Sequence, residues 1–131
     1  MNMISEENGI NPDIFKEAQE VMKKRFCEML TYYLEDVAIY LDEIQVGLKE
    51  RDPKKIYPAA HTIKSSSKQL GAMKVSDFAR EIEFAARAIS ENGESGANTF
   101  EIIAARAAEM EGNFRMSETA MKDFLTKESG S

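Results

Sequence analysis

The chain has almost none of the residues on which disulfide and metal chemistry depend. Its 131 residues include one cysteine, Cys27, and one histidine, His61. One cysteine cannot form an internal disulfide, and one histidine beside it cannot build a zinc site from a His/Cys cluster. A di-iron bundle is excluded too, because it needs a Glu-x-x-His motif on each of two helices. We therefore expect metal-free chemistry, with no cofactor of the protein's own.

Long apolar runs and an excess of positive charge are also absent. No apolar run approaches the roughly 20 residues that span a bilayer, and the first residues, MNMISEENG, lack the layout of a signal peptide. Acidic residues number 23 against 17 basic ones, for a net charge of −6. This charge opposes binding to nucleic-acid phosphates and to anionic membrane surfaces. We expect a cytoplasmic monomer that binds neither nucleic acid nor membrane.

The sequence has no alternating strand pattern and no repeat of fixed period, so apolar spacings of three to four residues decide the fold class. The 43% hydrophobic content is enough for a core. We predict one domain, residues 1–131, folded as an all-α antiparallel up-down four-helix bundle with an extended N-terminal helical segment. Residues 1–10 are expected to be mobile or a loosely docked turn, and residues 127–131 to fray.

The first helical run begins at an N-cap followed by proline, Asn11 and Pro12. Apolar residues at helical spacing continue from there to Arg51. Such a run is longer than most globular helices, so we allow a break in residues 31–36, where two aromatic and two acidic residues meet.

The next helix begins at a second cap and proline, Asp52 and Pro53. Pro58 should either bend this helix or separate a short turn from it, because proline lacks the N–H that an interior position needs. Gly71 should end the helix in a left-handed conformation, and an antiparallel helix should follow over residues 73–91.

The last helix should follow a loop at residues 91–98, the chain's only dense cluster of glycine and polar residues. Asn98, with Glu101 three residues on, fits a capping box at its start. Gly112 in the helix interior should weaken it by about 1 kcal/mol relative to alanine.

His61 lies on the second helix, opposite the apolar face of that helix. At about 100° per residue, it is turned roughly 160° from Ile63, so its ring should point into solvent. Lys64, Ser65 and Lys68 share its stripe. The apolar face consists of Ile56, Ala59, Ala60, Ile63 and Leu70. A histidine beside lysines on an open helix face is a poor core residue and a reasonable chemical one.

The stripe around His61 suits phosphoryl chemistry. A neutral imidazole can attack a phosphoryl group through one ring nitrogen and hold it. Lys64 is placed to neutralise charge on the phosphoryl oxygens, Lys68 to add a longer-range contribution, and Ser65 to donate a hydrogen bond. Neither a G-x-x-x-x-G-K-[ST] motif nor a kinase glycine loop is present. The phosphoryl group must therefore come from a partner that brings its own Mg²⁺.

The segment around the histidine resembles histidine-containing phosphotransfer (HPt) domains, the intermediates of multistep two-component phosphorelays. The shared pattern is Ala-His, a lysine three residues on, a small polar run, Leu-Gly-Ala, and spaced apolar residues before a closing Glu. It is matched here by Ala60, His61, Lys64, Ser66, Ser67, Leu70, Gly71, Ala72, Val75, Phe78, Ile82 and Glu83. The sequence departs from the pattern at Ser65, where the family usually has glycine.

The resemblance implies a phosphohistidine carrier without an ATP site or kinase activity. Such a carrier would accept a phosphoryl group on His61 from the aspartyl phosphate of a response-regulator receiver domain. It would pass the group to the same or another receiver, in a relay that includes a hybrid histidine kinase, and the receiver would dock over the His61 face.

Two alternatives to this carrier function stay open. One is a non-catalytic helical adaptor in which His61 is only a surface residue, and the other is a bundle whose grooves bind a partner helix.

Glu83 is the candidate partner of the histidine ring. In a hairpin that turns about Ala72, His61 and Glu83 are each eleven positions from the turn and should face each other. The carboxylate could then accept a hydrogen bond from Nδ1–H, which fixes the tautomer and leaves Nε2 as the nucleophile. HPt domains resemble this arrangement, with a Gln or Glu reaching toward the histidine. The alternative is a solvated acid that pairs with Arg80 or Arg87 on its own helix.

Overall fold

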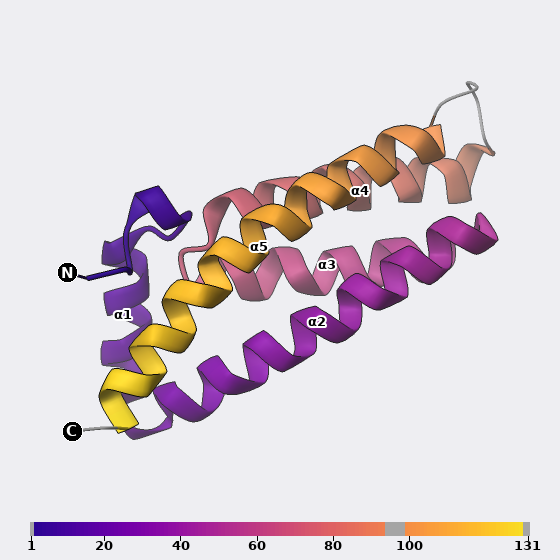
Figure 1. The fold of residues 1–131 in the computed structure, drawn as a ribbon. Coiled ribbons are helices and arrows are strands. Elements are labelled where there is room, and N and C mark those ends of the chain that lie inside the picture. The colour runs from indigo at the N-terminus through magenta and orange to yellow at the C-terminus, as the bar shows by residue number, and fades with distance from the viewer. Residues whose placement is uncertain (1, 94–98, 130–131) are drawn as a thin grey trace.

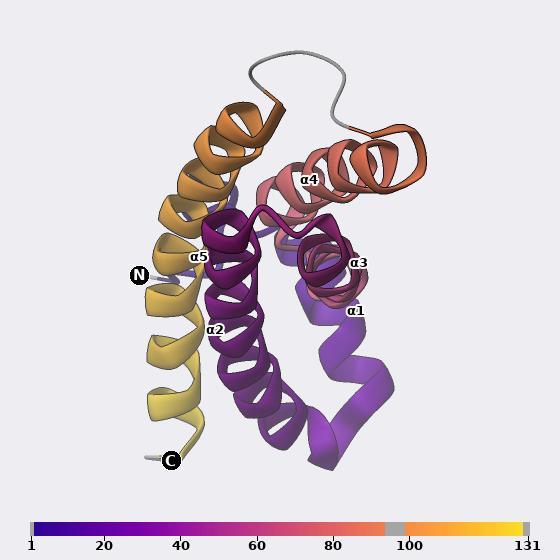
Figure 2. The same ribbon diagram turned by 90° about the vertical axis from the view of Figure 1, so that its right-hand side faces the viewer.

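The computed structural model describes residues 2–93 and 99–129, and every regular element in them is a helix. The elements are η1 (Glu6–Asn8), α1 (Pro12–Met22), η2 (Lys23–Arg25), α2 (Phe26–Glu50), α3 (Pro53–Gln69), α4 (Met73–Asn92) and α5 (Thr99–Ser129). Helices α2 to α5 run alternately up and down beside one another, and α1 lies across the end of the bundle at which α5 finishes (Figures 1 and 2). The predicted all-α bundle with an extended N-terminal helical segment is confirmed. Within the described residues, no helix has the length and apolar character to cross a membrane.

Both predicted cap and proline pairs start helices. The Asn11 side chain accepts hydrogen bonds from the backbone N–H groups of Asp13 and Ile14, at 3.0 and 3.1 Å, and begins α1. The Asp52 side chain accepts from Lys54 N at 3.0 Å and begins α3. Each carboxylate or amide oxygen satisfies backbone donors that have no partner inside the first helical turn.

The break in the first helical run lies earlier than predicted. Helix α2 continues without interruption through residues 31–36, whereas α1 ends at Met22 and a 3-10 turn, Lys23–Arg25, joins it to α2. Lys23 has a positive φ of 51°, which is unfavourable for a residue with a Cβ. The expected break at residues 31–36 is therefore wrong. Tyr33 and Leu34 face the core of the bundle while the acidic residues that follow them stay exposed, so both kinds of residue fit one continuous helix.

An aromatic cluster accounts for the position of this turn. The rings of Phe15, Phe26 and Phe124 meet edge to face, with centroids 5.1 to 5.7 Å apart. These rings come from α1, α2 and α5, so the turn at residues 23–25 folds α1 back until Phe15 can reach the other two. Edge-to-face pairs at this separation add to the apolar burial of the rings.

Pro58 lies inside α3 without dividing it. The helix is continuous from Pro53 to Gln69, so of the two alternatives, a bend or a separate turn before Pro58, the separate turn is not formed. Pro58 is the sixth residue of α3 and has no N–H to donate to the carbonyl of Lys54, so the helix lacks one i→i−4 hydrogen bond there. The Pro58 carbonyl still accepts a hydrogen bond from the Thr62 hydroxyl at 3.2 Å.

Gly71 makes the turn between α3 and α4, as predicted. Its φ is +84°, in the left-handed region that glycine adopts without steric cost. Its carbonyl accepts a hydrogen bond from Asn11 N at 2.8 Å, and a Cβ at this position would lie 2.7 Å from Asn11 O. The start of α1 therefore packs directly on the turn of the hairpin.

The N-terminal segment is a docked turn. Ile4 and Ile10 are buried, and the Ser117 hydroxyl of α5 donates to Asn8 O at 3.0 Å.

At the C-terminal end, α5 continues to Ser129, where fraying was expected from residue 127. Residues 130 and 131 lie outside the described part of the chain. The expected loop at residues 91–98 and its Asn98 cap also fall mostly outside it.

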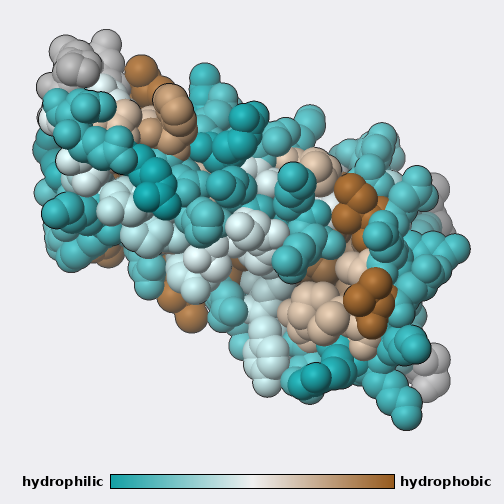
Figure 3. Space-filling model, turned by 180° about the vertical axis from the view of Figure 1, so that it is seen from behind, coloured by the Kyte–Doolittle hydropathy of each residue, from teal (hydrophilic) through white to brown (hydrophobic). Residues whose placement is uncertain are grey.

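Hydrophilic residues cover most of the face shown in Figure 3, and the apolar ones form separate patches. Among residues 2–93 and 99–129, the large apolar side chains that stay exposed are Val21, Tyr32, Ile39, Val46, Phe84, Ile102 and Met116. Exposed apolar residues in small groups are usual on soluble domains.

Candidate functional site

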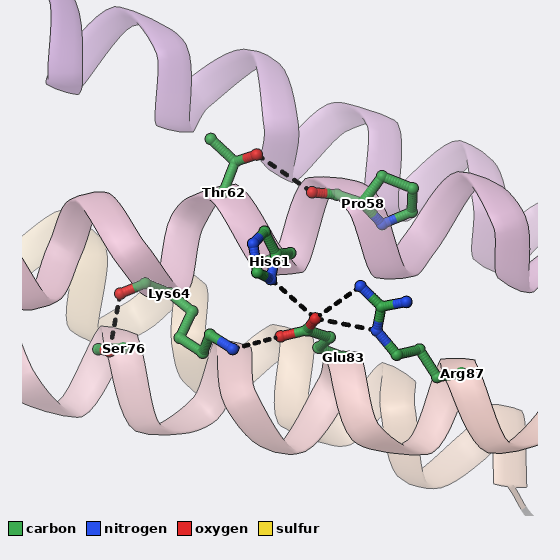
Figure 4. A network of polar contacts seen from close by, with 7 residues as sticks. All are labelled: Pro58, His61, Thr62, Lys64, Ser76, Glu83 and Arg87. Carbon is green, nitrogen blue, oxygen red and sulfur yellow. Dashed lines mark hydrogen bonds and ion pairs between the residues drawn. The ribbon is translucent and has the colours of Figure 1, made fainter.

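The site lies where α3 and α4 face each other, and its centre is His61. The His61 side chain is 52% exposed, whereas Ala60 and Ile63 on the opposite side of α3 are completely buried. The helix therefore holds the ring on the surface while its apolar face packs in the core, as the residue spacing predicts. Figure 4 shows the ring between α3 and the side chains that rise from α4.

The ring of His61 is held through one nitrogen. His61 Nδ1 lies 2.9 Å from Glu83 Oε2, so the two residues face each other across the hairpin as their equal distance from Ala72 predicts. An ionised carboxylate can only accept hydrogen bonds, so Nδ1 must carry the proton. The lone pair is then on Nε2, on the far side of the ring from Glu83 (Figure 4).

Glu83 is a buried acid of α4. Its side chain is only 8% exposed and accepts from three basic side chains. Lys64 Nζ lies 2.7 Å from Oε1, and Arg87 Nε and Nη2 lie 3.0 and 2.9 Å from Oε2. Burial raises the pKa of Glu83, but hydrogen bonds from Lys64, Arg87 and His61 outweigh it and hold the pKa below its ordinary value.

Lys64 has a partner, Glu83, that residue spacing did not predict. Its ammonium was expected beside His61, available to a phosphoryl group, but it pairs with Glu83 and is 29% exposed. The expected contact with His61 is formed, and so is a pair with Arg87 of the same helix, but Glu83 is buried and is therefore not the solvated acid of the alternative. One carboxylate is thus the centre of a network that joins α3 to α4.

Ser65 and Lys68 lie on the open side of the hairpin. Both are exposed, and with Lys64 they line a shallow hollow of about 370 Å³. The rest of the lining comes from Met73, Ser76, Asp77 and Arg80 of α4. Beneath the hollow, the buried Ser76 hydroxyl donates to Lys64 O at 2.9 Å, which fixes the backbone of α3 beside the site.

Ser67 has a second function besides the close packing expected of it. It is completely buried, and its hydroxyl lies 2.7 Å from the Tyr33 hydroxyl of α2. Burial raises the pKa of Tyr33 above its ordinary range, so this phenol stays neutral. The hydrogen bond joins the second half of α3 to α2. It therefore keeps the other side of α3, which carries His61 and Lys64, directed toward solvent.

Arg87 is the contributing residue that sequence reasoning named only as an alternative. Besides its contacts with Glu83, its guanidinium carbon lies 4.5 Å from the ring centre of Tyr57. Tyr57 and Arg87 are each fifteen positions from Ala72. The counting rule that pairs His61 with Glu83 would therefore have found this contact too.

Metal ligands are not grouped near the site. In residues 2–93 and 99–129, no three His, Cys, Asp or Glu side chains are placed to share an ion. The carboxylate nearest His61 is already surrounded by basic groups.

An exposed histidine on a helical bundle, with Nδ1 held by a buried acid and Nε2 open, is typical of proteins that carry a phosphoryl group on a histidine. The Hpt domain family matches residues 28–112, which is more than half of the chain, and the chain belongs to this family. Members of the family are phosphocarriers of phosphorelays and not kinases.

A comparison with solved structures concerns the fold. Among solved structures, the chain is similar to histidine-containing phosphotransfer protein B (HptB) from Pseudomonas aeruginosa PAO1, with a TM-score of 0.78. The sequences are 20% identical, and the match covers 91% of this chain and 96% of that one. At this identity the likeness concerns the fold. Among curated proteins, none matches the chain.

Proposed function

We propose that the protein accepts a phosphoryl group on Nε2 of His61 from the aspartyl phosphate of a receiver domain and returns it to the same or another receiver. The observation that carries the proposal is the 2.9 Å contact between His61 Nδ1 and Glu83 on a half-exposed ring. It leaves the lone pair of Nε2 toward solvent, where a partner can approach.

The transfer exchanges one bond for another. The Nε2 lone pair forms an N–P bond while the P–O bond to the receiver aspartate breaks, and the electron pair leaves with the aspartate carboxylate. The Nδ1 proton stays on the ring, which becomes positively charged, and Glu83 stabilises that charge. The reverse step regenerates the neutral ring and an aspartyl phosphate on the acceptor.

The neighbouring residues serve the phosphoryl oxygens. Lys64 is within one helical turn of His61 and can exchange Glu83 for a phosphoryl oxygen, while Lys68 adds positive charge and Ser65 offers a hydroxyl. The receiver supplies Mg²⁺, and a hybrid histidine kinase is the expected source of the phosphoryl group further up the relay.

Transfer from a phosphorylated receiver tests the proposal. In the presence of Mg²⁺, the wild-type chain should gain a label that is lost in acid and kept in base, the stability of phosphohistidine. His61→Gln should gain none, while its helicity and melting temperature stay near those of wild type, because the side chain it replaces is on the surface. Chelation of Mg²⁺ should stop transfer to the wild-type chain.

Two results would contradict the proposal. Label on His61→Gln would show that another residue accepts the group. Absence of label on the wild-type chain with each of several receivers would instead favour a non-catalytic adaptor, in which His61 is an ordinary surface residue.

A further inference from the structure

Arg87 makes two different contacts, one with Glu83 of its own helix α4 and one with Tyr57 of α3. Its guanidinium binds Glu83 Oε2 through both Nε and Nη2, at 3.0 and 2.9 Å, and stacks on the Tyr57 ring at 4.5 Å. Tyr57 precedes His61 by one turn on α3, and Arg87 follows Glu83 by one turn on α4. The four side chains thus form two neighbouring pairs across the hairpin, His61 with Glu83 and Tyr57 with Arg87. Figure 4 shows His61, Glu83 and Arg87.

The two oxygens of Glu83 have separate donors. Oε2 accepts from His61 and Arg87, whereas Oε1 accepts from Lys64. Departure of the Lys64 ammonium would empty Oε1 and leave both contacts of Oε2 in place. The carboxylate would then keep one full positive charge beside it, from Arg87, and would still be aimed at Nδ1.

We propose that Arg87, held by Tyr57, is a positioning residue that keeps Glu83 directed at His61 when Lys64 turns to the phosphoryl group. The inference rests on the proposed function, since only transfer gives Lys64 a reason to leave. The proposal assigns Lys64 to the phosphoryl oxygens and Arg87 to the carboxylate. The two basic residues that pair with Glu83 therefore have different roles.

Tyr57 explains why Arg87 can hold this position. The Arg87 side chain is 45% exposed and, without a second contact, could exchange its ion pair for water. A stacked ring limits the rotamers of the guanidinium, and the planar fork can then present Nε and Nη2 to one oxygen together. Lysine has neither the fork nor the planar face, so it should replace Arg87 only in part.

The tautomer of the sole histidine is a direct readout of this arrangement. The ¹⁵N shifts of the His61 ring report the proton on Nδ1 without any transfer reaction. The measurement is made in the Lys64→Ala background, which reproduces departure of the lysine from Glu83. There we expect the Nδ1–H form with Arg87 intact, a mixture of tautomers with Arg87→Gln, and intermediate behaviour with Arg87→Lys. Acceptance from a phosphorylated receiver should fall about tenfold in Arg87→Gln, equivalent to about 1.4 kcal/mol of barrier.

Two variants of Tyr57 distinguish the contribution of its ring from that of its hydroxyl. Tyr57→Phe keeps the stacking surface and should retain the wild-type tautomer and rate. Tyr57→Leu removes the π face and should change both in the direction of Arg87→Gln. Equal losses in the two variants would overturn the stacking role.

Arg115→Gln is the matched control. Arg115 pairs with Glu118 at 3.1 Å and Glu111 at 3.4 Å and stacks on Phe114 at 5.5 Å, all on α5 and away from His61. Its loss removes the same charge and the same kinds of contact, and should change neither the tautomer nor the rate. If Arg87→Gln behaves like Arg115→Gln, the proposal is wrong.

The outcomes remain distinct from those that test the proposed function. A wild-type chain that takes no label refutes transfer, whereas an unchanged tautomer in a folded Arg87 variant refutes the positioning role. Should Arg87→Gln fail to fold, Arg87→Lys and Tyr57→Leu decide the question, and wild-type tautomer and rate in both would overturn it.

Discussion

Glu83 is a buried acid that the protein keeps ionised. Removal of a carboxylate from water is costly unless donors replace the lost hydration. Here Lys64, Arg87 and His61 together supply four such contacts within 3.0 Å. The same contacts that offset the cost also aim the carboxylate, because each donor comes from a helix position that the backbone fixes.

The stability of the protein should therefore depend on pH through Glu83. Its folded-state pKa lies below the ordinary value of 4.5, so the ionised form stabilises the fold above that pH, and the contribution is lost as pH falls through the folded-state pKa. We expect Glu83→Gln to lower the free energy of unfolding near neutral pH by about 1 to 3 kcal/mol. The gap from wild type should shrink in acid below pH 4.5. Urea unfolding at a series of pH values measures it.

Glu109→Gln provides the comparison for this series. Glu109 lies on α5 and is about half exposed, in a surface pair with Arg106. Surface pairs contribute little, so this variant should stay close to wild type throughout. A gap for Glu83→Gln that is constant from neutral pH to strong acid would show that ionisation of Glu83 does not stabilise the fold.

Ser65 tests the departure from the family pattern. The side chain is exposed one position after Lys64, at the surface where a receiver would approach. Ser65→Gly removes a hydroxymethyl group there and should preserve or raise the transfer rate, despite a helix cost of about 0.5 to 1 kcal/mol. Single-turnover transfer from a phosphorylated receiver, with unfolding measured in parallel, separates the two effects.

Ser66→Gly is the control for Ser65→Gly. Ser66 is half-buried, and its hydroxyl donates to Thr62 O at 2.9 Å, within α3. It should show the helix cost without a gain in rate. A strong loss of transfer in a folded Ser65→Gly protein would mean instead that the Ser65 hydroxyl contacts the phosphoryl group.

At the scale of elements, the hairpin of α3 and α4 was the most predictable part of the molecule. Two helices with the same rise, joined at Gly71 and Ala72, bring residues at equal distance from the turn face to face, which placed Glu83 opposite His61. The same rule applied one turn further pairs Tyr57 with Arg87. Counting positions from the turn identifies neighbouring residues. It does not show which of several basic residues will bind one carboxylate, so the contact of Lys64 with Glu83 was not predicted.

The end of α1 shows the opposite case. Apolar spacing continues across residues 22–26, so periodicity alone indicates one helix. The turn depends on Phe124, about a hundred positions away in sequence, whose ring completes the cluster with Phe15 and Phe26. Local pattern carries no information about such a contact, and the tertiary packing overrides it.

Gly71 is the residue on which the hairpin turn depends. Gly71→Ala places a Cβ in a left-handed backbone and 2.7 Å from Asn11 O. We expect a loss of at least about 2 kcal/mol in the free energy of unfolding, from backbone strain and displacement of the α1 start. Chemical denaturation followed by circular dichroism measures it.

Gly112→Ala makes the same chemical change without these constraints. Gly112 lies inside α5 with nothing within 4 Å of its added Cβ. The substitution should stabilise the protein by up to about 1 kcal/mol, since alanine is the better helix former. Equal effects of the two substitutions would contradict the structural account of the turn.

At the scale of the whole molecule, composition and spacing predicted the helical bundle, the exposed histidine and the starts of α1 and α3, because each follows from local chemistry. What they could not predict involves side chains that compete for one partner or meet across the bundle. The sequence left open whether residues 1–10 are mobile or docked, and the contact that decides it, from Ser117 of α5 to Asn8, belongs to this group.

The contacts differ greatly in how far apart in sequence their members lie, and this bears on how the chain folds. His61 and Glu83 are separated by 22 positions, whereas Ser117 and Asn8 are separated by 109. A short loop closes with little loss of chain entropy and a long one with more, so local contacts tend to form first. We therefore expect the hairpin that carries the histidine to form early, and the N-terminal turn to join α5 late, after the site has been assembled.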